Sequence, residues 1–263
     1  MGVPYRRYNS TGFSLGGFWR GVPPAIKTLL IIMTAVFLAQ VASGVIFGAA
    51  GLIWINYHLG LVPLAVVKGL RIWQPFTYIF LHGGLWHLLV NLFVLWMFGA
   101  DIERVWGERK FYKYFFICGV GAGLIDVAVN WIPAAFGRSV STVPTIGASG
   151  AIFGVLIAAA MVFPDRRVWL LPLPITLSMR VYVAIMVGIE FFLTLDAPGD
   201  NISHFCHLGG ILVGYLYLRR GSFFYKVRNA GSDWKRRRTR RKFEVYMRDH
   251  SKDAPPRSGP WVN

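Results

Sequence analysis

The sequence predicts an all-α membrane protein, a bundle of six transmembrane helices with a long interfacial loop between the first two helices. Three observations favour this fold class: 55% of the 263 residues are hydrophobic, only 15% are charged, and the apolar residues come in blocks. Lipid offers no partner to exposed backbone groups, so spanning segments are helices or closed barrels, and these blocks lack the alternation of a barrel. The net charge of +16 does not indicate nucleic-acid binding, because half of the 28 Lys and Arg residues follow Leu218.

The chain is predicted to have three parts. Residues 1–24 are polar and basic and lack the apolar core of a signal peptide, so we expect a cytoplasmic N-terminal tail. Residues 25–219 form the six-helix domain, and residues 220–263 form a basic cytoplasmic tail that attracts anionic membrane lipids. From their apolar blocks, the helices are expected at residues 28–50, 85–99, 111–132, 149–163, 180–195 and 203–218.

Two stretches between these blocks are apolar but broken by Gly and Pro. Residues 51–84 are also rich in Trp and Tyr, and residues 168–177 contain two prolines, so both are interpreted as interfacial. The blocks at 85–99, 180–195 and 203–218 are shorter than the roughly 20 residues that a bilayer core requires. We interpret these short helices as enclosing a polar site.

Charge predicts the orientation of the six helices. With the N-terminus inside, the inner segments carry 25 of the 28 Lys and Arg residues, and the outer segments carry only Lys68, Arg71 and Arg138. The positive-inside rule therefore places both termini in the cytoplasm.

Ser149 stands between glycines at the head of an apolar block. One interpretation is packing, because Gly150 and Gly154 form a stripe that lets another helix approach closely. The other is a nucleophile beside unpaired helix N-terminal amides, which can stabilise an oxyanion. This segment alone does not separate the two, so a base elsewhere in the chain has to decide.

Polar residues inside the apolar blocks are candidate functional groups, because they are costly in a membrane. His87 and Asn91 are four residues apart and share one face of a helix. His207 lies on the same stripe as Gly210 and Gly214, and packing this stripe against Gly150 and Gly154 would bring Ser149 near His207. With the predicted topology, these groups converge near the outer membrane face.

In their order and spacing, these motifs resemble those of the rhomboid family of intramembrane serine proteases, over nearly all of residues 70–218. The similar segments are His87-x-x-x-Asn91 preceded by His82, Gly99-x-x-x-Glu103-x-x-x-Gly107, Gly147-x-Ser149-Gly150 and His207-x-x-Gly210-x-x-x-Gly214. The resemblance implies a multi-pass serine endopeptidase that needs no cofactor or metal. We expect cleavage of single-pass transmembrane proteins near the outer face of a bacterial cytoplasmic membrane, and the bacterial assignment rests on the six-helix form and the lack of a transit peptide.

The resemblance also implies a role for each site residue. Ser149 would be the nucleophile and His207 the general base, while Asn91, His87 and the Ser149 amide would hold the oxyanion. The family needs no acidic third residue, and none is evident in the sequence. Phe153 stands where some members have a tyrosine that stacks on the catalytic histidine. The supporting residues are Gly147, Gly150, Phe153, Gly210 and Gly214.

Three residues lie outside this pattern. Gln74 follows Trp73 where many members have an arginine, which puts a loop-locking role of that position in question. Glu190 lies inside the block at 180–195 and is interpreted as a protonated or hydrogen-bonding group without a named partner. His204 is interpreted as a structural histidine or a water-access group.

Two other function classes stay open. One is a metal-binding membrane protein that uses His82, His87, His204 and His207, because His-x-x-His spacing on a helix suits a divalent ion. The other is a transporter or a substrate-binding pseudoprotease. The serine motif disfavours the metal interpretation, and the absence of inverted repeats disfavours a transporter.

Overall fold

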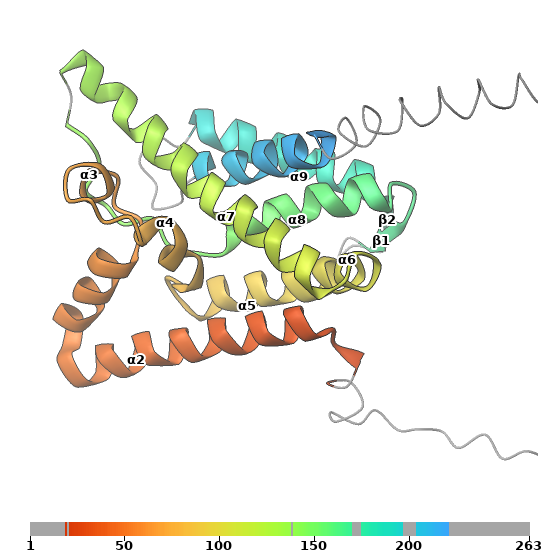
Figure 1. The fold of residues 1–263 in the computed structure, drawn as a ribbon, viewed down its shortest axis with the longest axis horizontal. Coiled ribbons are helices and arrows are strands. Elements are labelled where there is room, and N and C mark those ends of the chain that lie inside the picture. Colours follow the sequence, from red (N-terminus) through yellow and green to blue (C-terminus); the bar gives the residue numbers. More distant parts are fainter. Residues whose placement is uncertain (1–18, 20, 138, 170–174, 197–203, 221–263) are drawn as a thin grey trace, which may run out of the picture. The chain divides into compact units, whose positions relative to one another are not determined.

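The computed structural model describes residue 19 and residues 21–137, 139–169, 175–196 and 204–220. The named elements, in chain order, are α2 (Pro24–Leu59), α3 (Pro63–Val67), α4 (Gln74–Thr77), η1 (Tyr78–Phe80), α5 (Leu85–Val94), η2 (Leu95–Gly99), α6 (Ala100–Trp106), α7 (Glu108–Trp131), η3 (Ile132–Phe136), α8 (Ser149–Val162), β1 (Arg167–Trp169), β2 (Thr176–Ser178) and α9 (Met179–Asp196) (Figure 1). A further helix covers residues 204–220. The chain divides into two compact units, Met1–Leu216 and Tyr217–Asn263, and the candidate site lies in the first.

Helix α2 is longer than predicted and is bent. It continues from Pro24 to Leu59, and its direction changes at Gly48, where φ is 64°. A glycine tolerates this left-handed conformation because it has no Cβ. The side-chain amide of Gln40 donates to Asn56 Oδ1 over 3.1 Å and ties the two arms together. The predicted start of the loop at residue 51 was therefore wrong, since α2 continues to Leu59, and α3, α4 and η1 form short helical turns in the rest of residues 51–84. The interfacial position of this stretch stays a prediction.

Gln74 holds this region in place. Its side chain is fully buried, accepts from the Val62 amide over 3.0 Å, and donates to the Tyr57 carbonyl over 2.9 Å. Arg71 lies over the Tyr57 ring and donates to the same carbonyl. The sequence put a loop-locking role of position 74 in question because it lacks an arginine there. In the structure, the neutral side-chain amide of Gln74 holds the loop, and Arg71, three residues earlier, assists it.

The second predicted helix does not end at Gly99. α5 passes into a π-helical segment at Leu95–Gly99 and then into α6, so the helical path runs from Leu85 to Trp106. A Cβ at Gly99 would lie 2.7 Å from Ile26 Cδ1, so the glycine allows α2 to pack closely there. The predicted helix was too short because Gly99 was interpreted as the end of the helix, whereas it is a glycine that allows close packing.

Glu103 is buried and caps the start of α2. Its two carboxylate oxygens accept from the Ala25 and Ile26 amides over 2.8 and 2.9 Å. These are first-turn amides, which have no partner within their own helix. Glu103 therefore supplies from α6 the cap that Pro23, just before α2, cannot supply with a side chain.

Glu103→Ala is expected to lower the free energy of unfolding by about 3 kcal/mol, because two charge-assisted hydrogen bonds to buried amides are lost. Thermal unfolding of the purified protein in detergent measures this change. Glu108→Ala is the matched control, since this exposed glutamate in the first turn of α7 contributes only a helix-dipole term of about 0.3–1 kcal/mol. Equal melting temperatures for the two variants would contradict the capping role.

The core lies where α7 and α8 pack together. α7 contributes the buried side chains of Phe111, Tyr114, Phe115 and Cys118, and α8 contributes mostly small residues such as Ala151. α8 also contacts α5, η2 and α9, so this short helix is enclosed by its neighbours (Figure 1). A helix of 14 residues is tolerable in that position because protein, and not lipid, surrounds it.

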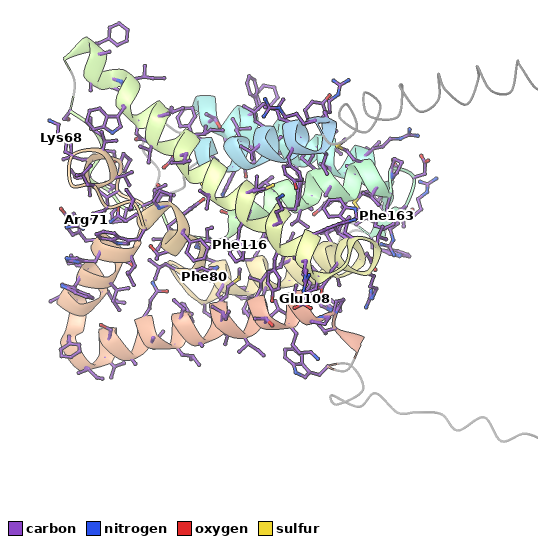
Figure 2. All side chains as sticks on the ribbon, viewed as in Figure 1. Lys68, Arg71, Phe80, Glu108, Phe116 and Phe163 are labelled. Carbon is purple, nitrogen blue, oxygen red and sulfur yellow. The ribbon has the colours of Figure 1, made fainter. Side chains whose placement is uncertain are left out.

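Within the described residues, three helices are long and apolar enough to cross a membrane: Pro24–Leu59, Leu85–Trp106 and Glu108–Phe136. Figure 2 shows Lys68 and Arg71 beside α3, and Glu108 toward the other end of α7. Phe80 and Phe116 lie between these ends, with ring centroids 6.2 Å apart. An apolar middle with charged residues toward the ends is typical of a spanning segment. The number of six spans stays a prediction.

Candidate active site

Ser149 is the first residue of α8. Gly147, two residues earlier, has a φ of 129°, and its amide donates to the Tyr78 carbonyl over 3.0 Å. A Cβ at Gly147 would lie 2.8 Å from His87 Cε1 and Nε2, so the His87 ring occupies the space that a side chain would need. The chain can enter α8 by this route only with glycine at 147, and the first-turn amides of α8 then flank Ser149.

The two glycine stripes meet. A Cβ at Gly210 would collide with the Gly150 carbonyl oxygen, and a Cβ at Gly214 would lie 3.0 Å from Gly154 Cα. The backbone of α8 therefore packs directly against the backbone of helix 204–220, as small residues permit. This close packing places Ser149 and His207 at the same level.

Ser149 and His207 are in hydrogen-bond contact. Ser149 Oγ lies 2.6 Å from His207 Nε2, within the usual range for a serine and its general base. Phe153, one turn after Ser149 in α8, stacks on the His207 ring at a centroid distance of 4.8 Å and an interplanar angle of 28°. The imidazole is therefore held between a stacked aromatic ring and the serine hydroxyl.

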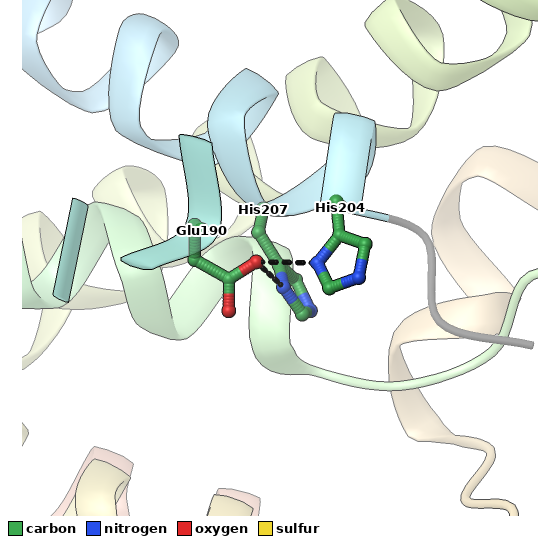
Figure 3. A group of neighbouring side chains, drawn as sticks. All are labelled: Glu190, His204 and His207. Atoms are coloured by element: carbon green, nitrogen blue, oxygen red, sulfur yellow. Dashed lines mark hydrogen bonds and ion pairs between the residues drawn. The ribbon is translucent and has the colours of Figure 1, made fainter. Parts of the chain in front are cut away.

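Glu190 of α9 is the residue that sequence reasoning left unassigned. Its Oε2 atom lies 2.9 Å from His207 Nδ1 and 2.8 Å from His204 Nδ1 (Figure 3). The structure supplies the partners of Glu190 that the sequence could not name, and it places a carboxylate on His207 where the sequence showed no evident acidic third residue. The signal was present in the sequence, because a single carboxylate within an apolar helix is costly unless it has a partner. What the sequence lacked was the packing of α9 against helix 204–220.

The predicted oxyanion residues lie on α5. Asn91 is buried, and its side-chain amide donates to the His87 carbonyl over 2.9 Å. The Gly83 amide donates to His87 Nδ1 over 3.3 Å, so the remaining proton of a neutral His87 ring is on Nε2, the atom beside Gly147. The oxyanion function of both side chains stays a prediction.

His82 supports the His87 ring. The two rings contact edge to face at a centroid distance of 5.2 Å, and the His82 backbone amide donates to Gln40 Oε1 over 3.0 Å. His82 lies in the loop before α5, where burial lowers its pKa to about 4 and keeps the ring neutral at physiological pH. Because this ring is neutral, it adds no positive charge beside the site.

One metal-ligand grouping occurs among the residues that the structure describes. It consists of Glu190, His204 and His207, whose ligand atoms all lie within 4.8 Å of one another. The four-histidine set suggested by the sequence is not this grouping, because His82 and His87 pair with each other on the α5 side. The three side chains that could hold a metal are thus the ones already joined by the contacts of the two Nδ1 atoms with the Glu190 carboxylate.

The structure is that of a helical membrane protein in which a serine and a histidine are in contact at a helix N-terminus. Residues 69–222 match the Rhomboid domain, and the chain therefore belongs to the rhomboid family. The chain is accordingly a multi-pass integral membrane protein, in agreement with its apolar helices.

Curated relatives from bacteria and mitochondria are similar to this chain. Rhomboid protein 1, mitochondrial, of Saccharomyces cerevisiae is 29% identical over 143 residues, which is 52% of this chain and 38% of the relative. Human presenilin-associated rhomboid-like protein, mitochondrial, is 29% identical over 147 residues, covering 54% of this chain and 36% of that protein. Rhomboid protease GluP of Bacillus subtilis is 29% identical over 144 residues, covering 55% and 25%. The chain thus matches well under half the length of these relatives.

Proposed function

We propose that this chain is an intramembrane serine endopeptidase that uses Ser149 as nucleophile and His207 as general base. The observation that carries the proposal is the 2.6 Å contact between Ser149 Oγ and His207 Nε2 at the N-terminus of α8. Membership of the rhomboid family and similarity to Rhomboid protease GluP support it.

The reaction follows from this geometry. Ser149 Oγ forms a bond to the carbonyl carbon of the substrate while its proton moves to His207 Nε2. When the tetrahedral intermediate collapses, the C–N bond breaks and the same proton passes to the leaving amine. Water then attacks the acyl-enzyme and loses a proton to His207. His207 returns this proton to Ser149 Oγ as the bond between Oγ and the acyl carbon breaks, which releases the second product and the free serine.

The negative charge that develops on the carbonyl oxygen needs donors. The Ser149 backbone amide, His87 Nε2–H and the Asn91 amide are the proposed oxyanion donors, with the position of the His87 ring against Gly147 as the supporting contact. Loss of one such donor costs a hydrolase roughly 2.7–4 kcal/mol of transition-state stabilisation. Asn91 would have to exchange its present bond to the His87 carbonyl for the oxyanion.

The site is proposed to lie in a six-helix domain near the outer face of a bacterial cytoplasmic membrane, with both termini in the cytoplasm. The distribution of Lys and Arg supports this orientation. Single-pass transmembrane proteins are the proposed substrates, since the nucleophile belongs to an enclosed helix within the membrane domain.

A metal-binding membrane protein is the second candidate function, and the observation that favours it is the Glu190, His204 and His207 grouping. A metal on His207 Nδ1 would be central to such a protein, whereas the proposed protease needs a proton on that atom. Chelation by EDTA therefore separates the two: the protease keeps its activity, and a metal-dependent protein loses it.

Substrates are expected to be selected by how readily their helix unwinds. A peptide carbonyl in a spanning helix is hydrogen-bonded to the amide four residues later, so Ser149 can reach it only after local unwinding. In liposomes, a single-pass substrate with Gly or Pro in its outer half should be cut about five- to a hundredfold faster than one with uniform Leu there, because relative to Ala a Gly costs a helix about 1 kcal/mol and a Pro about 3. Equal rates at matched orientation and concentration would show that unwinding does not select substrates.

A further inference from the structure

The carboxylate of Glu190 lies between two imidazoles of helix 204–220. A single oxygen, Oε2, contacts Nδ1 of His204 at 2.8 Å and Nδ1 of His207 at 2.9 Å (Figure 3). The three side chains are largely shielded from solvent, with exposed fractions of 14% for Glu190, 6% for His204 and 13% for His207. Electrostatic contacts in such a setting are stronger than at a wet surface.

This contact determines which nitrogen of His207 carries the proton. An ionised carboxylate only accepts hydrogen bonds, so both Nδ1 atoms must be the donors. In a neutral His207, Nε2 is then left with its lone pair, and this is the atom 2.6 Å from Ser149 Oγ. A general base for serine needs this tautomer.

We propose that Glu190 is the positioning residue of a Ser149–His207–Glu190 array, which fixes the tautomer of His207 and stabilises the imidazolium formed when Ser149 is deprotonated. The inference rests on the proposed protease function and adds an acid to the serine and histidine. The proton taken from Ser149 stays on His207 Nε2 until the leaving amine receives it, and Glu190 takes up no proton.

His204 completes the arrangement by anchoring the carboxylate. Its Nδ1–H donates to the same oxygen that His207 contacts, so the oxygen cannot turn away from His207 without losing a second bond (Figure 3). Phe153 packs on the His207 ring face, and Glu190 holds its edge. Aromatic stacking and a charged hydrogen bond therefore fix different degrees of freedom of the same ring.

Glu190→Gln and Glu190→Asp distinguish a positioning role from a packing role. Gln has the shape of Glu without its charge, whereas Asp keeps the charge but leaves space. For positioning, we expect Gln to lower kcat by about 10²–10⁴-fold with KM changed less than twofold, since the equivalent amide substitution in Ser-His-Asp hydrolases costs about 10⁴ in kcat. Asp should retain more activity than Gln. A packing role predicts the reverse order.

The measurement uses the full chain in liposomes with a single-pass transmembrane substrate. Thr194→Val is the matched control, because Thr194 lies one turn further along α9 and its hydroxyl donates to the backbone carbonyl of Glu190, over 2.7 Å, not to its carboxylate. It should keep the wild-type kcat, and melting temperatures should show that all three variants fold.

Three outcomes would overturn the inference: wild-type kcat in Glu190→Gln, higher activity in Gln than in Asp, or loss of wild-type activity on adding EDTA, which would assign the three side chains to a metal. The first two leave the proposed protease function standing, because the wild type still cuts. A wild-type chain that does not cut at all would contradict the proposed function itself.

Discussion

Replacing Ser149 or His207 by Ala is expected to abolish cleavage, with a loss of about 10⁶-fold in kcat, as for serine hydrolases that lose either residue. Among the described contacts, the hydroxyl of Ser149 is the nucleophilic group that meets His207 Nε2. The described part of the chain therefore offers no second route to an acyl-enzyme. The two residues act as one unit through a single proton transfer. The double variant should therefore be no less active than either single variant.

Cleavage of a single-pass substrate in liposomes measures these losses. Ser149→Ala removes only one oxygen atom and should leave the melting temperature unchanged, while His207→Gln, which keeps most of the side-chain volume, controls for the space left by Ala. Asn91→Ala should lose less, about 10²–10³-fold, since it removes one of several oxyanion donors. Activity that survives Ser149→Ala would exclude the proposed mechanism.

Gly210→Ala is expected to lower both stability and activity. A Cβ at this position would collide with the Gly150 carbonyl oxygen, so helix 204–220 would have to move away from α8. Overpacking of this kind typically costs 1–3 kcal/mol and sometimes more, and backbone atoms cannot yield as a flexible side chain can. Because the same shift would separate His207 from Ser149, activity should fall together with the melting temperature.

The matched control for this variant is Gly188→Ala in α9. A Cβ at Gly188 meets nothing within 4 Å, so the substitution should leave the protein unchanged or stabilise it by up to about 1 kcal/mol through helix propensity. Thermal unfolding and cleavage rates of both variants test the packing. A Gly210→Ala protein as stable and as active as Gly188→Ala would show that the glycine stripes do not hold the site together.

The sequence predicted those parts of the fold that depend on local apolar patterning. Residues 149–163 and 111–132 were expected to be helices, and α8 and α7 occupy these positions within three residues at each end. Features that depend on distant contacts were missed. Helix α2 bends at Gly48, whereas Gly99 lies within a continuous helical path. The identity of a glycine does not show which of the two occurs, because the outcome depends on the residues packed around it.

The same distinction applies to the site. Spacing alone placed Ser149 and His207 on facing glycine stripes, and the structure brings them into contact. Glu190 could be recognised as an unusual intramembrane charge, but its partners could not be named. They depend on how α9 packs against helix 204–220, and no periodicity within either segment encodes that relation.

The most direct test of the central claim is labelling of the full-length protein in detergent with a fluorophosphonate, followed by mapping of the adduct by peptide mass spectrometry. A serine activated by His207 should be phosphonylated at Ser149 alone, at a rate unchanged by EDTA, and Ser149→Ala should take up no label. An unlabelled wild-type protein that is folded, or an adduct on any other residue, would contradict Ser149 as the nucleophile.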